Sequence, residues 1–264
     1  MQYDGIASII HGDCIEVMAS LPDESVDAIV TSPPYAEQRK ATYGGISEAE
    51  YPDWTVAWMA EARRLLKPDG SAIINITPHT RGGELSNYVL RTRLALQDDA
   101  WSELGEMIWH KNGMPTGSPS RPRRTWESLL WYGKHGRAWS DAKAAGQAPK
   151  MKTQIHTYGQ HTKRDDFGHY GGGSNSTPII ARVSDVLKLA TVRETTGHPA
   201  AFPWQLAEWC GKLICPPGGT ILDPFSGSAS TGVAAIRNGW DYIGIDAVEE
   251  YVEMSRKRLE GEAA

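Results

Sequence analysis

The chain has 264 residues, of which 40% are hydrophobic, so it can bury a full core in one large domain that carries a modest insertion. Its formal net charge of −5 argues against a protein that coats nucleic acid without specificity. Because the N-terminus lacks the pattern of a signal peptide and no apolar run approaches the ~18 residues that span a membrane, we expect a cytoplasmic protein.

Short β-branched runs followed by helical patterns predict that strands and helices alternate along most of the chain. The predicted elements are, in chain order, strands at 6–10 and 26–30, a helix at 51–66, strands at 71–76, 107–109, 128–132 and 220–222, a helix at 231–237, a strand at 242–245 and a helix at 249–259. This alternation implies an α/β fold with a mostly parallel sheet and helices on both faces.

The candidate sites all fall at strand ends, where an open α/β sheet binds its ligands. If the C-terminus is joined to the N-terminus in thought, their order becomes a glycine-rich loop, an acidic strand end, a Gly-Asp strand end and a Pro-Pro-Tyr loop. The order is that of a Rossmann-like nucleotide-binding fold that is circularly permuted, with its opening between the second and third strands.

The segment 112–197 lacks this alternation and is rich in Gly, Ser, His and Pro, so we expect an insertion there, although 128–133 reads as a further strand of the main sheet. Residues 1–111 and 198–264 would form the main domain. Between Lys111 and Tyr170 the chain has 11 Lys or Arg against four Asp or Glu, a local charge of +7 that leaves −12 on the rest. A basic segment with interleaved aromatic residues suits nucleic-acid binding, and the alternative is a solvated surface loop.

The segment from Asp223 to Thr231 has the composition of a cofactor loop, because small residues after a strand let backbone amides approach a ligand. It is neither a P-loop nor the full Gly-x-Gly-x-x-Gly of dinucleotide-binding proteins. Asp246 ends the next strand, where a carboxylate can accept hydrogen bonds from a ribose diol. The two features together indicate a ligand that contains adenosine and lacks a pyrophosphate, and S-adenosylmethionine fits that description.

The loop Thr31-Ser32-Pro33-Pro34-Tyr35 follows an apolar strand, which its prolines would in any case terminate. The side chains favour a catalytic role. The Ser32 hydroxyl and the Pro33 carbonyl could accept hydrogen bonds from a base amine, while Tyr35 stacks on the base.

The chain resembles the β-class amino-methyltransferases of DNA, the N4-cytosine and N6-adenine enzymes, over most of its length. The matching blocks are Gly12-Asp13 with Ser25-Val26-Asp27, Thr31 to Tyr35, Arg64 to Gly70, His198-Pro199-Ala200 with Phe202-Pro203, Asp223 to Ser228, and Tyr242 to Asp246. Together, in the right circular order, they are far more specific than any block alone. The resemblance implies a permuted fold of the S-adenosylmethionine-dependent methyltransferases, with a target-recognition insertion at 112–197.

The resemblance also implies roles for single positions. The catalytic residues would be Ser32, Pro33, Pro34 and Tyr35. The cofactor-binding residues would be Asp13, Cys14, Thr31, His198, Pro199, Phe202, Pro203, Asp223, Pro224, Phe225, Ser226, Gly227 and Asp246. Among these, the stretch from His198 would contact the methionine end of the cofactor, Asp13 and Cys14 its adenine, and Asp246 its ribose. The DNA-binding residues would be Lys111, Arg121, Arg123, Arg124, Lys163 and Arg164.

The expected partner is double-stranded DNA, and the expected setting is a bacterial or phage-encoded restriction-modification system. A homodimer and a cognate restriction endonuclease are further candidate partners, which the sequence leaves open. No metal is expected, since Cys14, Cys210 and Cys215 match no common zinc spacing.

Several alternative reactions can be weighed from the residues. Methylation at cytosine C5 needs a thiolate nucleophile, and none of the three cysteines follows a proline or lies near the Pro-Pro loop, so we reject it. Serine at the first position of the catalytic loop favours N4-cytosine within the family, and N6-adenine remains the alternative. An RNA or protein methyltransferase and a catalytically silent DNA-binding relative are less favoured.

Overall fold

The computed structural model describes residues 5–38, 45–111, 122–146, 182–191 and 202–263. The chain forms two units, one made of Met1–Asp141 with Ser184–Ala264 and the other of Ala142–Val183. All the helices, strands and sites that follow belong to the first unit.

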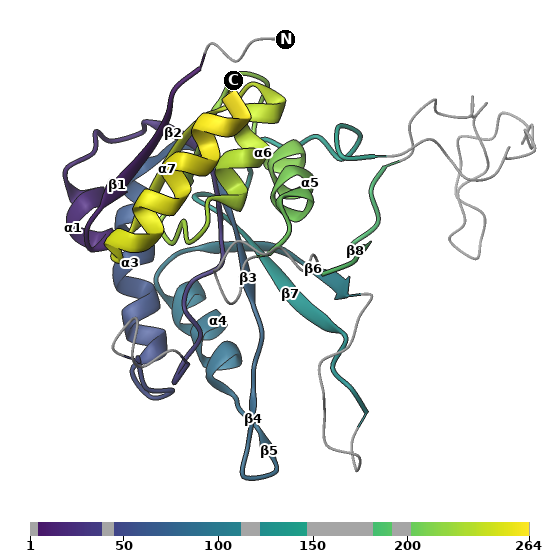
Figure 1. Ribbon diagram of the computed structural model, residues 1–264. Coiled ribbons are helices and arrows are strands. Elements are labelled where there is room, and N and C mark those ends of the chain that lie inside the picture. The colour runs from purple at the N-terminus through teal and green to yellow at the C-terminus, as the bar shows by residue number, and fades with distance from the viewer. Residues whose placement is uncertain (1–4, 39–44, 112–121, 147–181, 192–201, 264) are drawn as a thin grey trace, which may run out of the picture. The chain divides into compact units, whose positions relative to one another are not determined.

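An eight-stranded sheet forms the centre of the first unit (Figure 1). From edge to edge, the strands are β1 (Ala7–His11), β10 (Asp241–Asp246), β9 (Thr220–Asp223), β2 (Val26–Thr31), β3 (Leu66–Ile76), β7 (Trp126–Gly133), β6 (Ser102–Lys111) and β8 (Val186–Leu189). Among these strands, neighbours run parallel except at β7, which is antiparallel to both β3 and β6. A separate small hairpin pairs β4 (Thr80–Arg81) with β5 (Glu84–Leu85).

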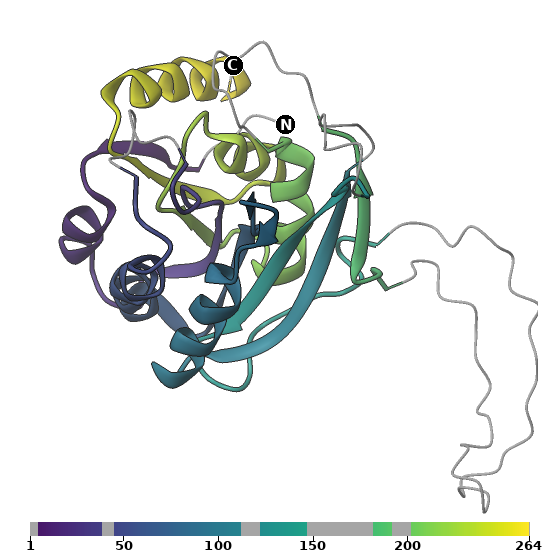
Figure 2. The same cartoon turned by 90° about the horizontal axis from the view of Figure 1, so that it is seen from below.

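Helices cover both faces of the sheet, as the two views in Figures 1 and 2 show. One face carries α1 (Cys14–Ala19), α3 (Tyr51–Leu65) and α4 (Tyr88–Asp98), and the other carries α5 (Trp204–Ile214), α6 (Ser230–Asn238) and α7 (Glu249–Ala263). No helix in the described part of the chain combines the length and apolarity needed to cross a bilayer. The predicted arrangement, a mostly parallel sheet between two helical layers, is confirmed.

The central strands are apolar because both of their faces are covered by helices. In β2, Val26 and Ile29 are fully buried, and Leu222 of β9 is fully buried beside them. The core on the α3 side contains the large rings of Tyr51 and Trp58, which are also fully buried. This rigid sheet fixes the positions of the loops that follow its strands.

The permuted order is confirmed by the pairing of the first and last strands. Strand β1 pairs in parallel with β10, with Ala7 opposite Tyr242 and His11 opposite Asp246. Strand β9 in turn lies between β10 and β2. The glycine-rich loop after β9, near the C-terminus, therefore lies at the same sheet edge as the loop after β2, near the N-terminus.

Some elements differ from the expectation. Helices α1, α4 and α5 and the short strand β8 were not predicted, and β3 begins five residues before the predicted Ser71. The strand expected at 128–133 is present as β7, but the expected insertion at 112–197 also contributes β8 to the main sheet, and the second unit is confined to Ala142–Val183. A strand of four residues such as β8 has too few alternations for a period of two to be recognised.

Candidate active site

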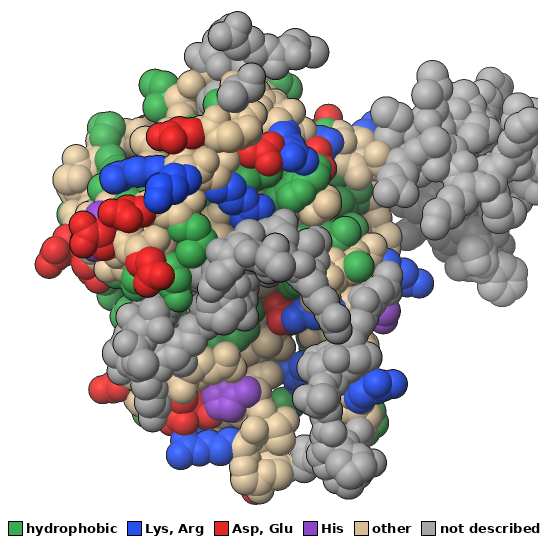
Figure 3. Space-filling view, viewed as in Figure 1, with side chains coloured by type: hydrophobic (Ala, Val, Ile, Leu, Met, Phe, Trp, Pro, Cys, Tyr) green, Lys and Arg blue, Asp and Glu red, His purple; other side chains and the backbone are tan. Residues whose placement is uncertain are grey.

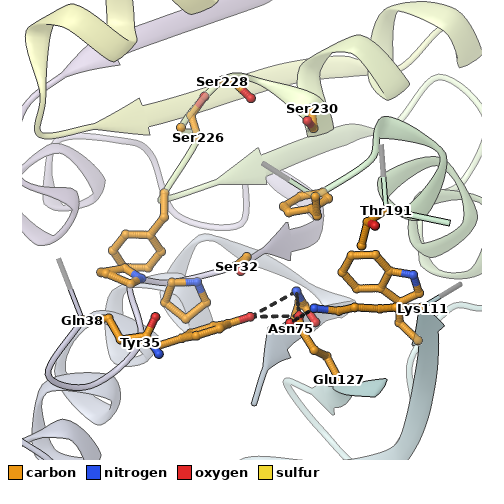
Figure 4. A pocket seen from close by; sticks show the side chains of 16 residues that line it. Ser32, Tyr35, Gln38, Asn75, Lys111, Glu127, Thr191, Ser226, Ser228 and Ser230 are labelled. Carbon is orange, nitrogen blue, oxygen red and sulfur yellow. Dashed lines mark hydrogen bonds and ion pairs between the residues drawn. The ribbon is translucent and has the colours of Figure 1, made fainter. Parts of the chain in front are cut away.

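A cavity of about 260 Å³ opens at the carboxyl edge of the parallel strands (Figure 4). The loops after β2, β8 and β9, the ends of β3 and β6, and the start of β7 all contribute to its wall. Its lining residues are Ser32, Pro33, Pro34, Tyr35, Gln38, Asn75, Trp109, Lys111, Glu127, Thr191, Phe202, Phe225, Ser226, Gly227, Ser228 and Ser230. The cavity thus joins the two loops that the sequence singled out from opposite ends of the chain.

The loop after β2 begins at Thr31, the last residue of the strand. Pro33 is buried, whereas Ser32 and Tyr35 are partly exposed toward the cavity. In Figure 4, Ser32 lies between Tyr35 on one side and the serines of the glycine-rich loop on the other. The four predicted catalytic residues, Ser32 to Tyr35, therefore line one wall together.

The loop after β9 is held by hydrogen bonds to residues of β10. Gly227 adopts a positive φ of 52°, a conformation that glycine accepts without strain. Its N–H donates to Oδ2 of Asp246 at 2.8 Å, and the N–H of Ser226 donates to the Ile245 carbonyl at 2.8 Å. The hydroxyl of Tyr242 also donates to the Ser226 hydroxyl, at 3.0 Å. The loop is therefore preorganised in the absence of a ligand.

Asp246 lies at the end of β10 and is 3% exposed. Its Oδ2 accepts from Gly227, and its Oδ1 accepts from the Val248 N–H at 2.9 Å. In this structure it holds the glycine-rich loop in place and is not among the lining residues of the cavity.

Asp223 lies beneath the glycine-rich loop, and its side chain is fully buried. It accepts hydrogen bonds from the hydroxyls of Thr31 at 2.6 Å and Thr231 at 2.7 Å, and from the Phe225 N–H at 3.1 Å. Burial raises the pKa of this carboxyl to about 6, although the three donors act in the opposite direction. Asp223 and Thr31 thus join the two loops from below and are not among the lining residues of the cavity.

The remaining predicted cofactor residues are distributed around the site. Asp13 caps α1, with its carboxylate accepting from the N–H groups of Ile15 and Glu16. Cys14, Pro203 and Pro224 do not line the cavity, whereas Phe202 and Phe225 do. Five predicted site residues lie outside the described residues: Arg121, Lys163, Arg164, His198 and Pro199.

A polar cluster on the cavity wall was not predicted as a unit. It consists of Asn75, Lys111, Glu127 and the hydroxyl of Tyr35. Lys111 was predicted as a DNA-binding residue, whereas here it pairs with Glu127 on the cavity wall. Asn75 is the single amide in the apolar run of β3, and Glu127 is an acid at the start of the apolar β7. A polar side chain inside a buried strand was the available signal, but the sequence alone does not say which face it occupies.

The cysteines lie apart from the cavity, and all three are buried. Burial raises the pKa of the Cys14 thiol to about 12, and it raises the thiol pKa values of Cys210 and Cys215 as well. Such thiols are protonated at neutral pH and are poor nucleophiles. The geometry therefore agrees with the rejection of a C5 mechanism.

Two of the described arginines of the basic stretch, Arg123 and Arg124, behave differently. Arg124 donates to the Thr77 hydroxyl at 3.0 Å and to the Pro78 carbonyl at 2.6 Å, and its guanidinium lies over the ring of Trp126. It thereby fixes the loop that follows β3. Arg123 is exposed, so its charge is available at the surface.

Glu37, Glu48 and His79 bring three potential metal ligands within 4.8 Å of one another. His79 Nε2 contacts Glu48 Oε1 at 2.8 Å, and Arg81 pairs with Glu37. Because Arg81 already supplies a positive charge to this group, we interpret it as an ion-pair network next to the β4-β5 hairpin.

Comparison with known proteins agrees with this geometry. A family model for N6 and N4 methyltransferases, described as DNA methylase, matches residues 26–257. The Type II methyltransferase M.ScaI of Streptomyces caespitosus is 30% identical, over 97% of this chain and 82% of the relative. The Type II methyltransferase M.PvuII of Proteus hauseri is 26% identical, over 96% of this chain and 83% of the relative.

Solved structures share the fold. The PvuII DNA methyltransferase, which is named as cytosine-N4-specific, superposes with a TM-score of 0.74 at 22% identity, covering 98% of this chain and 91% of the other. A DNA modification methylase from Thermus thermophilus, solved in complex with S-adenosyl-L-methionine, superposes with a TM-score of 0.67 at 23% identity, covering 98% and 96%.

Proposed function

Because the chain belongs to the DNA methylase family of N6 and N4 methyltransferases, we propose that it transfers a methyl group from S-adenosylmethionine to the N4 amine of cytosine in duplex DNA. The observation that carries this proposal is the shared cavity. The Ser32 to Tyr35 loop and the glycine-rich loop line the same space, although nearly 190 residues separate them in the sequence. Such a cavity suits a reaction between two bound molecules, which depends mainly on their relative orientation.

The residues of the glycine-rich side fit S-adenosylmethionine chemically. Phe225 offers apolar surface for the adenine and Phe202 for the methionine end of the cofactor, and the hydroxyls of Ser226, Ser228 and Ser230 offer polar partners. Gly227 lets the chain approach a ligand closely, and Asp246, whose carboxylate accepts from the Gly227 N–H, lies directly behind it. No basic residue of a P-loop is present, which agrees with a ligand that lacks phosphates.

The catalytic side would hold the base. When bound, S-adenosylmethionine would supply a methyl group on its sulfonium sulfur. The sulfur would keep the electron pair of the broken C–S bond, while the amine would form the new N–C bond and release one proton to water. The amine lone pair is delocalised into the base ring, so the protein has to orient it. The Ser32 hydroxyl and the Pro33 carbonyl would accept its N–H bonds, and the ring of Tyr35 would stack on the base.

The target nucleotide would leave the duplex, because its amine cannot reach the cavity from inside the base stack. Extrusion costs a few kcal/mol, which stacking on Tyr35 partly offsets. The segment 112–197, with its excess of Lys and Arg, would supply the target-recognition region, and Arg123 is one of its exposed described arginines. The relatives are named as Type II methyltransferases, which supports a restriction-modification setting, and a cognate endonuclease belongs to this proposal.

Cytosine is favoured over adenine for two reasons. Ser32 occupies the first position of the catalytic loop, where serine is associated with N4-cytosine in this family. The PvuII enzyme, which is similar over nearly the whole chain, is named as cytosine-N4-specific. N6-adenine is the alternative, since it needs the same orientation of an exocyclic amine.

Mass spectrometry of nucleosides tests the proposal. Duplex DNA amplified in vitro, and thus free of modified bases, is incubated with the protein and S-adenosylmethionine and then digested. We expect N4-methylcytosine as the product. The Tyr35→Ala variant, purified in the same way, should form less than about 1% as much because it loses the stacking surface, and it controls for contaminating enzymes. N6-methyladenine alone would refute the cytosine proposal, and methylation of RNA without methylation of DNA would refute the substrate class.

A further inference from the structure

Four polar groups from four different elements meet on the cavity wall opposite the glycine-rich loop (Figure 4). Tyr35 comes from the loop after β2, Asn75 from β3, Lys111 from the end of β6 and Glu127 from the start of β7. Three of these elements are adjacent strands of the sheet, in the order β3, β7, β6, so the cluster is built on rigid backbone.

Glu127 is the centre of this cluster and is 8% exposed. Its Oε2 accepts from Asn75 Nδ2 at 2.9 Å and from the Tyr35 hydroxyl at 3.1 Å, while its Oε1 accepts from Lys111 Nζ. All three partners act as donors, which suits an ionised carboxylate. A buried carboxylate needs a compensating charge, and Lys111 provides it.

The hydrogen bond to Glu127 determines how the amide of Asn75 is oriented. Because Nδ2 donates to a carboxylate, which can only accept, the amide cannot flip without losing this bond. Its Oδ1 is buried and has no hydrogen-bond partner among the described residues. Leaving a buried acceptor unpaired costs roughly 1 to 3 kcal/mol, so a donor is expected from a molecule that binds here.

We propose that Glu127, held by Lys111, is a positioning residue that orients Asn75 so that its Oδ1 shares one of the two N–H bonds of the target amine with the Pro33 carbonyl, in a three-centre hydrogen bond. Asn75 lines the cavity near Ser32 and Tyr35, so an amine placed on that wall is a suitable donor. The same carboxylate fixes the hydroxyl end of Tyr35, and with it the ring on which the base would stack. This inference rests on the proposed function.

An exchange of amide and carboxylate tests the proposal. The Glu127→Gln variant keeps the shape of the side chain but no longer fixes the amide of Asn75, and it leaves Lys111 without its counter-ion. The Asn75→Asp variant places the carboxylates of residues 75 and 127 about as close together as Asn75 Nδ2 and Glu127 Oε2 now lie, at 2.9 Å. The double variant Asn75→Asp/Glu127→Gln restores one amide, one carboxylate and the net charge, and the new carboxylate keeps an acceptor for the amine.

The measurement is the single-turnover rate of methyl transfer from labelled S-adenosylmethionine to amplified duplex DNA. We expect each single variant to fall about 100-fold and the double variant to recover to within about 10-fold of wild type. Dissociation constants for S-adenosylmethionine should stay within about threefold in all variants. This recovery in rate at unchanged cofactor affinity is a result that a merely structural role would not produce.

Glu103→Gln is the matched control. Glu103 lies on β6, pairs with Arg93 and has a side chain that is 12% exposed, compared with 11% for Glu127, but it does not line the cavity. Its variant should keep the wild-type transfer rate even if its melting temperature falls as far as that of Glu127→Gln.

Two results would overturn the inference while leaving the proposed function intact: a Glu127→Gln rate within about threefold of wild type, or a double variant as slow as the slower single variant. A wild-type protein that methylates no base amine would overturn the proposed function, and this inference with it. The two failures are therefore distinguishable in one set of assays.

Discussion

Asp223 is a single residue that connects both halves of the site. Its buried carboxylate accepts from Thr31 below the catalytic loop and from Thr231 at the start of α6. Burial raises its pKa to about 6, above the value of 3.8 that is usual for aspartate. The residue thus stabilises the junction through its hydrogen bonds while carrying a charge in an unfavourable environment at neutral pH.

The raised pKa predicts a pH-dependent stability that Asp223→Asn removes. Between about pH 4 and pH 6 the unfolded chain releases this proton while the folded chain keeps it, so the free energy of unfolding of the wild type falls as pH rises. Above about pH 6 both states are ionised and the effect is constant. The asparagine has no such titration, so its stability relative to wild type should rise across this window, by at most about 1.4 kcal/mol per pH unit.

Denaturant unfolding of both proteins at several pH values between 4 and 8 measures this difference. The asparagine amide can donate to the Thr231 hydroxyl, which lies 3.4 Å from the Val30 carbonyl and can donate to it in turn, so the variant should still fold. A stability difference that is the same at every pH would contradict the raised pKa of Asp223.

Single site residues could be predicted from the sequence where their own chemistry is distinctive, but not where their role depends on how the strands pack. Ser32 and Tyr35 were predicted because a hydroxyl and a ring beside two prolines are unusual at a strand end, and the structure places both in the cavity. Asn75 and Glu127 were not predicted, since each is one polar residue in an apolar strand. Their proximity arises from strand pairing, with Asn75 opposite Leu129 in β7 and so only two positions from Glu127.

Helix α6 supports the side of the cavity where we propose that the cofactor binds. It begins at Ser230, directly after the glycine-rich loop, and packs on β10 through Gly232. A Cβ at Gly232 would lie 2.6 Å from Cε1 of Tyr242 and 2.9 Å from Cδ2 of Leu259. The helix can approach the strand this closely because residue 232 has no side chain.

Gly232→Ala should therefore lower the free energy of unfolding and weaken S-adenosylmethionine binding together. Gly261→Ala in α7 is the control, because a Cβ there meets nothing within 4 Å. Both variants gain about 1 kcal/mol of helix propensity, so the difference between them isolates the steric clash. We expect Gly232→Ala to be about 2 kcal/mol less stable than the control in denaturant unfolding. Equal stability of the two variants would show that α6 can move away from β10 without a loss in the free energy of unfolding.

Elements were predictable where their pattern was clear, whatever their length: the four-residue β9 was predicted, and the eleven-residue helices α4 and α5 were missed. The long helix α3 ends within one residue of its predicted end, because its apolar residues recur at helical spacing up to Leu65. The six-residue helix α1 was missed, since it contains fewer than two turns and is held by the cap at Asp13. Strand β8 was missed because its position depends on pairing with β6.

On the scale of the whole molecule, the order of strand ends in the sequence was enough to predict the permuted sheet. The structure confirms it by placing β1 beside β10 and β9 beside β2. The extent of the insertion was not predictable in the same way, because β8 joins the main sheet as well as β7, which was expected there. The uneven charge, +7 between Lys111 and Tyr170 and −12 elsewhere, is a property of the sequence as a whole and gives the last prediction.

Arg123→Ala should weaken binding to duplex DNA and reduce the salt dependence of binding. One lost phosphate contact lowers the slope of log K against log salt concentration by about 1. Lys257→Ala is the matched control, since it removes the same charge from an exposed position on α7. There the positive and negative side chains are interspersed (Figure 3), and α7 packs against β1 and β10, away from the cavity strands β3, β6 and β7. If fluorescence anisotropy with a labelled amplified duplex gives both variants the wild-type slope, Arg123 does not contact DNA.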